Sequence, residues 1–162
     1  MKTWCHTVWA LLMAITLATA CGDGSCYNNG SSLPLARFYT SGTTTTATVT
    51  ALTVRGIGVP GDSLLIDSAA TSEFFMPLRA TTTVTQYELT YGRGQEARSD
   101  TITLRYRPIP YFASHECGAM YNYEVSDLEC THHVTDSVTL AVSTITNAGT
   151  VALRIYLPAS NQ

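Results

Sequence analysis

The amino-acid sequence predicts an all-β domain, and three observations lead to this fold class. Thr, Val, Ile and Tyr dominate the chain beyond residue 33, apolar and polar residues alternate over several short runs, and Gly, Pro or Asn separates those runs. Alternation with a period of two is typical of strands that bury one face, and no segment shows a helical period. We therefore expect a single immunoglobulin-like β-sandwich of about 7–9 short strands, with a small β-barrel as the alternative.

The expected strands are defined by this alternation, and turn residues separate them. Clear alternation covers residues 48–54, 84–91, 101–106, 121–125, 138–142 and 151–156. Shorter candidates lie at 36–39, 64–66 and 74–78, and turn signals occupy 56–61, 92–94 and 147–149. Pro108 and Pro110 cannot both donate hydrogen bonds within a central strand, so we expect residues 107–112 at a sheet edge or a corner.

The N-terminus has the pattern of a bacterial lipoprotein signal peptide. Lys2, the only lysine in the chain, precedes an apolar run over residues 8–17, and small residues lead to Cys21. The run is too short to span a membrane, so we expect cleavage before Cys21 and attachment of lipid to its thiol. Ala18 stands where such signals usually have Leu, and ordinary secretion with cleavage near Ala20 is the alternative.

These features divide the chain into three parts. Residues 1–20 are the expected lipoprotein signal peptide, and residues 21–32, which are rich in Gly, Ser and Asn, are the expected flexible tether. Residues 33–162 form the expected sandwich domain. The predicted location is the bacterial cell envelope, where lipid on Cys21 holds the protein at the outer membrane, facing either the periplasm or the cell surface.

The charge of the chain excludes some classes of partner. The net charge is -3, with 9 Lys and Arg against 12 Asp and Glu, and no basic residues cluster. Nucleic-acid binding needs a concentrated cationic face, so we expect no nucleic-acid partner. Electrostatic binding to anionic lipid is excluded on the same ground. The membrane is therefore an expected partner only through the lipid anchor.

Three cysteines remain beyond the signal peptide and the lipidated residue, namely Cys26, Cys117 and Cys130. An odd number allows at most one bridge within the chain, and an oxidising compartment favours its formation. Spacing alone leaves two pairings open. A Cys117–Cys130 bridge would be local, whereas a Cys26–Cys117 bridge would join the N-terminal segment to the distant half of the chain.

One short pattern, Asp followed by a hydroxyl residue and an apolar residue, recurs four times. It occurs at residues 62–64, 67–69, 100–102 and 136–138. One interpretation is turn chemistry, in which the Asp accepts hydrogen bonds from backbone amides just before a strand. The other is that the pattern resembles the O-glycosylation acceptor of exported proteins in some Gram-negative anaerobes. The candidate acceptors are Ser63, Ser68, Thr101 and Ser137.

Residues 61–64 spell Gly-Asp-Ser-Leu, the nucleophile block of the GDSL hydrolases. A serine nucleophile needs a His held by an acid and donors for an oxyanion, and the usual C-terminal Asp-x-x-His is missing. His132 and His133 would point to opposite faces of a strand, so we expect no metal site. We expect no catalytic residue and no cofactor, with a hydrolase that uses Ser63 and His132 or His133 as the alternative.

A group of aromatic side chains allows two interpretations. They could line a platform that binds carbohydrate, but a β-sandwich also needs such residues in its core, and the core is the expectation. The group consists of Phe74, Phe75, Tyr106, Tyr111, Phe112, Tyr121 and Tyr123.

The order of several motifs resembles that of a known family. The motifs lie at residues 33–39, 52–58, 62–67, 75–78, 100–104, 106–118 and 154–156. The most specific part is Pro110-Tyr111-Phe112 followed by Glu116-Cys117-Gly118. The arrangement covers nearly the whole chain after Cys21 and resembles the uncharacterised lipoproteins of Bacteroidetes-type bacteria known as domain of unknown function number 6452.

This resemblance implies a location and an attachment but no activity. It implies lipid on Cys21, a disulfide between Cys26 and Cys117 that leaves Cys130 spare, and an outer-membrane β-barrel as a partner. It also makes the Asp-Ser-Leu of residues 62–64 part of a family pattern, which weakens the hydrolase interpretation. We expect a non-catalytic binding or assembly module, and a structural subunit that exchanges strands with its neighbours is a further alternative.

Overall fold

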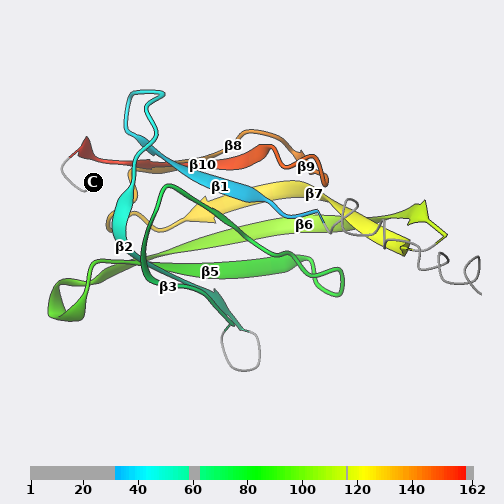
Figure 1. Cartoon of the computed structure of the whole chain (residues 1–162), viewed down its shortest axis with the longest axis horizontal. Coiled ribbons are helices and arrows are strands. Elements are labelled where there is room, and N and C mark those ends of the chain that lie inside the picture. Colours follow the sequence, from blue (N-terminus) through cyan, green and yellow to red (C-terminus); the bar gives the residue numbers. More distant parts are fainter. Residues whose placement is uncertain (1–31, 59–62, 116, 160–162) are drawn as a thin grey trace, which may run out of the picture.

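A computed structural model describes residues 32–58, 63–115 and 117–159, and within them ten strands form two sheets (Figure 1). The smaller sheet has the order β4-β1-β10-β8. Its strands are β4 (Glu73–Phe75), β1 (Leu35–Thr40), β10 (Val151–Leu157) and β8 (Ser137–Leu140). The larger sheet has the order β3-β2-β5-β6-β7-β9. Its strands are β3 (Ser63–Thr71), β2 (Val49–Ile57), β5 (Val84–Tyr91), β6 (Arg98–Ser114), β7 (Gly118–Cys130) and β9 (Thr144–Ile145).

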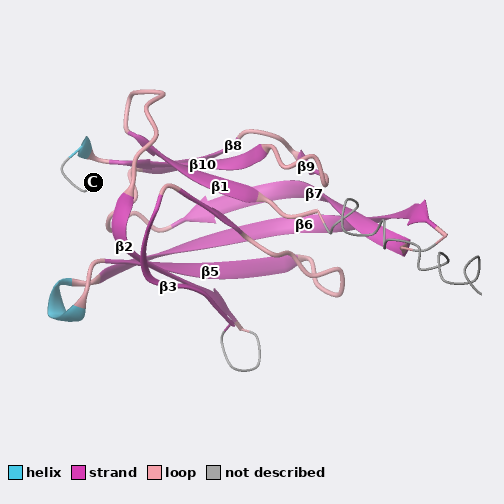
Figure 2. Ribbon diagram, in the orientation of Figure 1, coloured by secondary structure: helices cyan, strands magenta, loops and turns pink. Residues whose placement is uncertain are grey.

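The predicted all-β sandwich is confirmed (Figure 2). Each expected run overlaps a strand, and β5 has the predicted bounds, whereas the runs at 48–54, 74–78 and 138–142 extend past β2, β4 and β8. Three features differ from the prediction. Strands β6 and β7 are much longer than the alternating runs that predicted them, and β9 is too short to show a periodic pattern. Strand β1 pairs in parallel with β10, so the first and last strands are neighbours. Among the described residues, no helix is long and apolar enough to cross a membrane.

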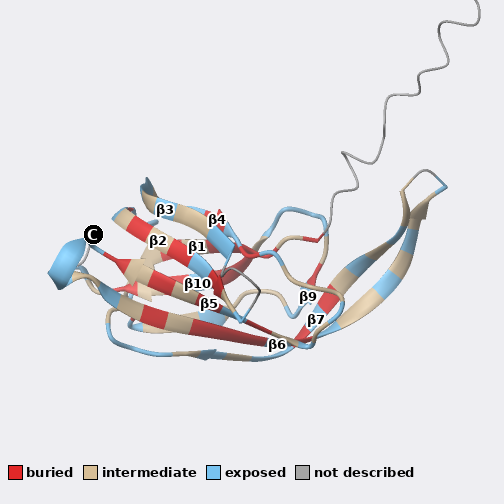
Figure 3. Cartoon of the chain, turned by 90° about the horizontal axis from the view of Figure 1, so that it is seen from below, coloured by how far each residue is buried: buried red, intermediate tan, exposed pale blue. Residues whose placement is uncertain are grey.

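The core lies between the two sheets and is built from the inward residues of each strand (Figure 3). Alternation is regular on β5, where the burial changes at every residue, and it is interrupted on β10 by the consecutive buried residues Ala152 and Leu153. Strand β3 is the exception, because it is an edge strand whose pairing with β2 is interrupted by register shifts. The largest fully buried side chains are Phe38, Leu52, Met76, Leu89, Ile102, Leu104, Leu153, Ile155 and Leu157.

A two-stranded ribbon extends from the larger sheet where β6 and β7 continue beyond their neighbours (Figure 3). Strand β5 pairs with β6 only as far as Arg105. From Pro108 onward β6 pairs with β7 alone, and Pro110 is also in this part. Proline has no amide hydrogen to offer a third strand, so no further strand joins β6 here, as the sequence predicted for an edge. On the other side, β7 pairs with β9 only as far as Tyr123, at the base of the ribbon. We call residues 108–114 and 118–123 the arm.

Candidate functional site

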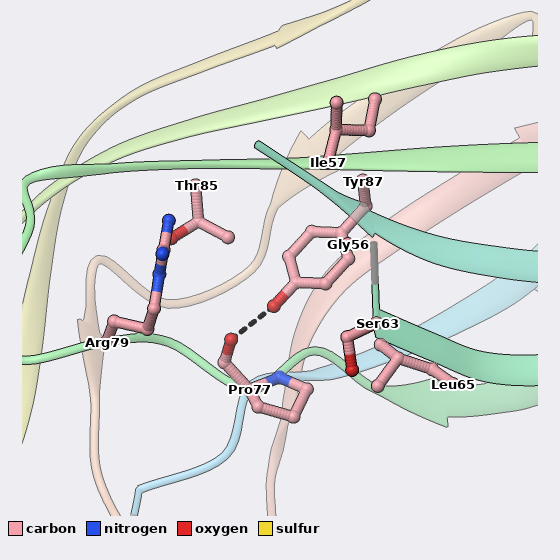
Figure 4. A pocket seen from close by; sticks show the side chains of 8 residues that line it. All are labelled: Gly56, Ile57, Ser63, Leu65, Pro77, Arg79, Thr85 and Tyr87. Carbon is pink, nitrogen blue, oxygen red and sulfur yellow. Dashed lines mark hydrogen bonds between the residues drawn. The ribbon is translucent and has the colours of Figure 1, made fainter. Parts of the chain in front are cut away.

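A cleft of about 240 Å³ opens beside the end of β2 and is the best candidate for a binding site (Figure 4). Three strands and one connecting segment form its walls. The lining residues are Gly56 and Ile57 of β2, Ser63 and Leu65 of β3, Thr85 and Tyr87 of β5, and Pro77 and Arg79 of the segment between β4 and β5. Most of this wall is aliphatic or aromatic, and the polar groups at its surface are few.

The segment that carries Pro77 and Arg79 is fastened to the larger sheet by three tyrosines on adjacent strands. Tyr87 of β5 donates a hydrogen bond to the carbonyl oxygen of Pro77 (Figure 4). Tyr106 of β6 donates to the carbonyl of Arg79 at 3.0 Å, and Tyr123 of β7 donates to that of Leu78 at 3.1 Å. Three consecutive carbonyls are therefore held by three hydroxyls. Burial raises the pKa of Tyr87, so its hydroxyl remains a donor at any physiological pH.

The hydroxyl of Tyr106 is the most heavily used of the three. It accepts the amide hydrogen of Arg79 at 3.1 Å and donates to the carbonyl of the same residue. It also lies 2.7 Å from the hydroxyl oxygen of Thr85. Because Tyr106 has one hydroxyl hydrogen and gives it to Arg79, Thr85 must be the donor in that third bond. One oxygen atom therefore fixes both the backbone of Arg79 and the side chain of Thr85.

The guanidinium of Arg79 is the unusual group of the cleft. Its Nε is fully buried and has no hydrogen-bond partner among the described residues. A buried donor without a partner is costly, by about 1–3 kcal/mol, and more when the group is charged. Within the same part of the chain Arg79 forms no ion pair. The cleft therefore combines an apolar wall with an arginine whose Nε lacks an acceptor in the described part of the chain.

The structure does not bring together the residues of the alternative serine site. Ser63 lines the cleft, but His132 and His133 do not approach it. Asp100, which holds His133, lies on β6, three strand spacings from β3, or about 14 Å along the sheet. The Nδ1 atom of His133 is 3.1 Å from the Asp100 carboxylate, and that of His132 is 3.1 Å from the carbonyl of Thr135.

Asp100 is buried, with 1% of its surface exposed, and serves the fold. One carboxylate oxygen accepts from the amides of Val134 and Thr135 at 2.9 and 2.7 Å. The other accepts from the amide of His133 at 2.6 Å and from the Thr131 hydroxyl at 2.9 Å. Burial raises the pKa of this carboxyl, but these donors outweigh it and lower the pKa to about 2. At Asp100 the turn interpretation was right about the chemistry and wrong about the place, because this residue lies within β6 and accepts from the amides of a distant loop. Asp136 does directly precede β8, and its carboxylate accepts from the Ser41 hydroxyl.

The four candidate glycosylation residues lie on three strands and do not cluster. Ser63 and Ser68 are on β3, Thr101 is on β6 and Ser137 is on β8 of the smaller sheet. Ser68 has a φ of 45°, and its hydroxyl accepts a hydrogen bond from the Nε of Arg93 at 2.6 Å. Their modification stays a prediction.

The cysteines are separated in the fold. Cys130 is a free thiol, so the local Cys117–Cys130 bridge is not formed, and Cys117 at the end of the arm is not free. Cys21 and Cys26 lie outside the described residues, and their roles stay predictions. Burial, followed by the nearby Asp100 carboxylate, raises the pKa of Cys130 to about 12, which keeps this thiol protonated and unreactive. In residues 32–58, 63–115 and 117–159, no group of three or more His, Cys, Asp or Glu side chains could hold a metal ion.

The aromatic group divides between core and surface. Phe74, Tyr106 and Tyr123 are buried, as the core interpretation expects. Phe75, Phe112 and Tyr121 are exposed, and they lie on two different sheets, so they form no single platform.

Sequence reasoning did not identify Arg79, because nothing in its immediate neighbours marks it. A signal was nevertheless present. Residues from three of the motif segments, 52–58, 62–67 and 75–78, meet at this cleft. Separate motifs that converge in space are expected at a binding site, and the convergence becomes visible only once the strand order is known.

Comparison with known proteins gives a family without an activity. No curated protein matches the chain, and no solved structure matches it. The model of a family of unknown function, DUF6452, matches residues 48–157, which include every residue named as lining the cleft. The chain belongs to the DUF6452 family.

Proposed function

We propose that this protein is a lipoprotein of the bacterial cell envelope whose β domain is a non-catalytic binding module. The lipid attaches to Cys21, and the cleft beside Arg79 takes the ligand. The observation that carries the binding role is the buried Nε of Arg79, which has no partner among the described residues and borders a largely apolar wall. A ligand with an acidic group and an apolar body supplies what this site lacks.

The volume of the cleft limits the size of the ligand. At about 240 Å³ it lies below the usual range for sites that enclose a whole drug-sized molecule, roughly 300–1,000 Å³. The cleft therefore takes a small carboxylic acid or the acidic end of a longer molecule. The hydroxyl of Ser63 also lines the cleft, on the other side of the Tyr87–Pro77 hydrogen bond from Arg79 (Figure 4), and adds a donor for a polar part of the ligand.

Hexanoate is a suitable probe of this site, with hexan-1-ol as the uncharged analogue. We expect hexanoate to bind about tenfold more tightly, because a charge-assisted hydrogen bond to the Arg79 guanidinium contributes at least 1.4 kcal/mol. Arg79→Gln should remove this preference and leave hexan-1-ol binding unchanged. Amide chemical shifts of Gly56, Ile57 and Leu65, followed in a titration, measure both affinities.

The matched control for that titration is Arg98→Gln. It removes the same charge from an exposed side chain that does not line the cleft. The control should keep the full preference for hexanoate. Equal affinity for the acid and the alcohol in the unchanged protein would contradict the proposed site.

Substitution of Cys21, the proposed site of lipid attachment, tests the lipid anchor. Cys21→Ser should remove the diacylglycerol mass from the protein and move it from the membrane fraction to the soluble fraction, because no other segment is proposed to hold it there. Intact-mass measurement and fractionation of natively expressed protein check this. Cys26→Ser is the control and should remain acylated. A protein that begins after Ala20 without added mass would support ordinary secretion instead.

We also propose that Cys26 is the disulfide partner of Cys117. Cys130 is excluded as that partner because its thiol is free. Such a bridge would attach the N-terminal segment to the end of the arm.

A further inference from the structure

The arm has one face that is apolar, exposed and free of charge. Residues directly opposite in an antiparallel pair share a face, which places Pro110, Phe112, Ala119 and Tyr121 together. Phe112 is 66% exposed and Tyr121 is 38% exposed, and they are two of the four large hydrophobic residues that are exposed in the described part of the chain. A soluble domain normally avoids such a surface on a projecting ribbon.

Charge is absent from nearly the whole length of the arm. Glu116 is the only Asp, Glu, Lys or Arg between Arg107 and Glu124. Those two residues form an ion pair at the base of the arm, with the Arg107 Nη2 2.5 Å from the Glu124 carboxylate. The two strands of the arm thus carry charge only at their base, and Glu116 lies between them in the sequence. This order is typical of segments that enter the interface of a lipid bilayer, where aromatic rings concentrate.

The path of the chain brings this arm toward the expected lipid anchor. The described chain starts at Ser32, which is buried and donates a hydrogen bond to the Asn122 side chain of the arm at 2.9 Å. Cys21 precedes Ser32 by eleven residues, which reach at most about 40 Å when extended. From Asn122 to the end of the arm at Gly118 is only about 14 Å. The anchor can therefore lie beyond the end of the arm, on the same side of the domain.

The face that meets Ser32 is the opposite one. Asn122 pairs with Ile109 and shares its face with Tyr111 and Met120, and all four are half-buried. The face of Phe112 and Tyr121 is exposed, and near the end of the arm the Phe112 ring contacts the edge of the His115 ring, with centroids 5.5 Å apart. We propose that this open face of the arm lies in the headgroup region of the membrane that holds Cys21, so that the protein contacts lipid at two points. This inference rests on the proposed lipid anchor, and it adds an orientation of the domain with the arm directed at the membrane.

A single tryptophan tests the inference. Both tryptophans of the chain, Trp4 and Trp9, precede Cys21 and leave with the signal peptide, so Phe112→Trp introduces a unique probe. The acylated variant is placed in vesicles of phosphatidylethanolamine and phosphatidylglycerol. We expect its emission to shift to shorter wavelength on binding and to be quenched by lipids brominated high in the acyl chain.

Gln95→Trp is the control. Gln95 is exposed in the 3-10 turn Gly94–Glu96, at the end of the long axis away from the arm (Figure 1). Its emission should not change when vesicles are added or brominated lipid is used. An acylated Phe112→Trp protein that behaves like this control overturns the inference and points to a protein or the N-terminal segment as the cover of the arm.

Intact mass measured on the same samples separates the two proposals. A protein with acylated Cys21 and an unshifted arm tryptophan retains the lipoprotein function and loses the arm contact. A protein without an acyl group whose arm tryptophan still shifts on vesicles supports the arm contact and contradicts the lipid anchor. A second variant, Tyr121→Trp, probes the same face from β7 and should report the same depth.

Discussion

Asp100→Asn is expected to lower the free energy of unfolding by about 3 kcal/mol, because the carboxylate is a buried acceptor that an amide cannot replace. Each carboxylate oxygen accepts two or more hydrogen bonds, from the Val134 and Thr135 amides on one side and from Thr131 and His133 on the other. An Asn side chain must turn its NH2 group toward one of these sets. At least two buried donors then face another donor. Urea denaturation at neutral pH measures the loss.

The same residue predicts a pH dependence with a defined sign. The pKa of Asp100 is about 2 in the folded protein, against 3.8 ordinarily, so the unfolded chain takes up a proton first as the pH falls. The stabilisation from this group is therefore complete above about pH 4 and disappears as the pH approaches 2. Over this range the difference in unfolding free energy between the unchanged protein and Asp100→Asn should shrink by roughly 2 kcal/mol.

Asp127→Asn is the matched control for both measurements. Asp127 is about half exposed and lies 3.4 Å from Arg105 in a surface ion pair, which contributes at most about 1 kcal/mol. Its replacement should leave stability nearly unchanged at neutral pH. Equal unfolding free energies for Asp100→Asn and Asp127→Asn would show that the loop of residues 131–135 does not depend on the buried carboxylate.

The alternation in the sequence predicted most strands because the two sheets bury one face each. Strand β5 is predicted to the residue for this reason, since β6 pairs with its full length and β2 pairs with it from Gln86 to Tyr91. Strand β3 is longer than its predicted core at residues 64–66, because an edge strand with register shifts has no regular burial to impose a pattern. The prolines at 108 and 110 indicated an edge correctly, yet they also concealed the continuous length of β6.

The candidate site was less accessible to sequence reasoning than the fold. Tyr106 and Tyr123 were predicted as core residues, and their rings are buried. The partners of their hydroxyls are carbonyls of a segment 27 and 45 residues away, and only the folded chain shows that proximity. Arg79 is one of eight arginines beside a single lysine, and its type alone carries no sign that its Nε is buried.

Tyr106→Phe is expected to reduce stability by about 2 kcal/mol and to loosen the cleft. The hydroxyl of Tyr106 holds both the amide and the carbonyl of Arg79 and accepts from Thr85, which is itself buried. Phenylalanine keeps the edge-to-face contact of this ring with Tyr123, whose centroid is 5.4 Å away, so packing is retained while three hydrogen bonds are lost. Urea denaturation and hydrogen exchange of the Arg79 amide measure the two effects.

Tyr123→Phe is the control that removes a tyrosine hydroxyl without removing the hydrogen bonds to Arg79. The Tyr123 hydroxyl makes one hydrogen bond, to the carbonyl of Leu78. We therefore expect this variant to lose about 1 kcal/mol of unfolding free energy, and we expect hydrogen exchange of the Arg79 amide to stay as slow as in the unchanged protein. If the tyrosines serve the cleft, Tyr106→Phe should also weaken hexanoate binding, because Arg79 is no longer held against the apolar wall, while Tyr123→Phe should weaken it less. Equal effects of the two variants on stability, exchange and binding would mean that the hydroxyls support the core alone and do not position Arg79.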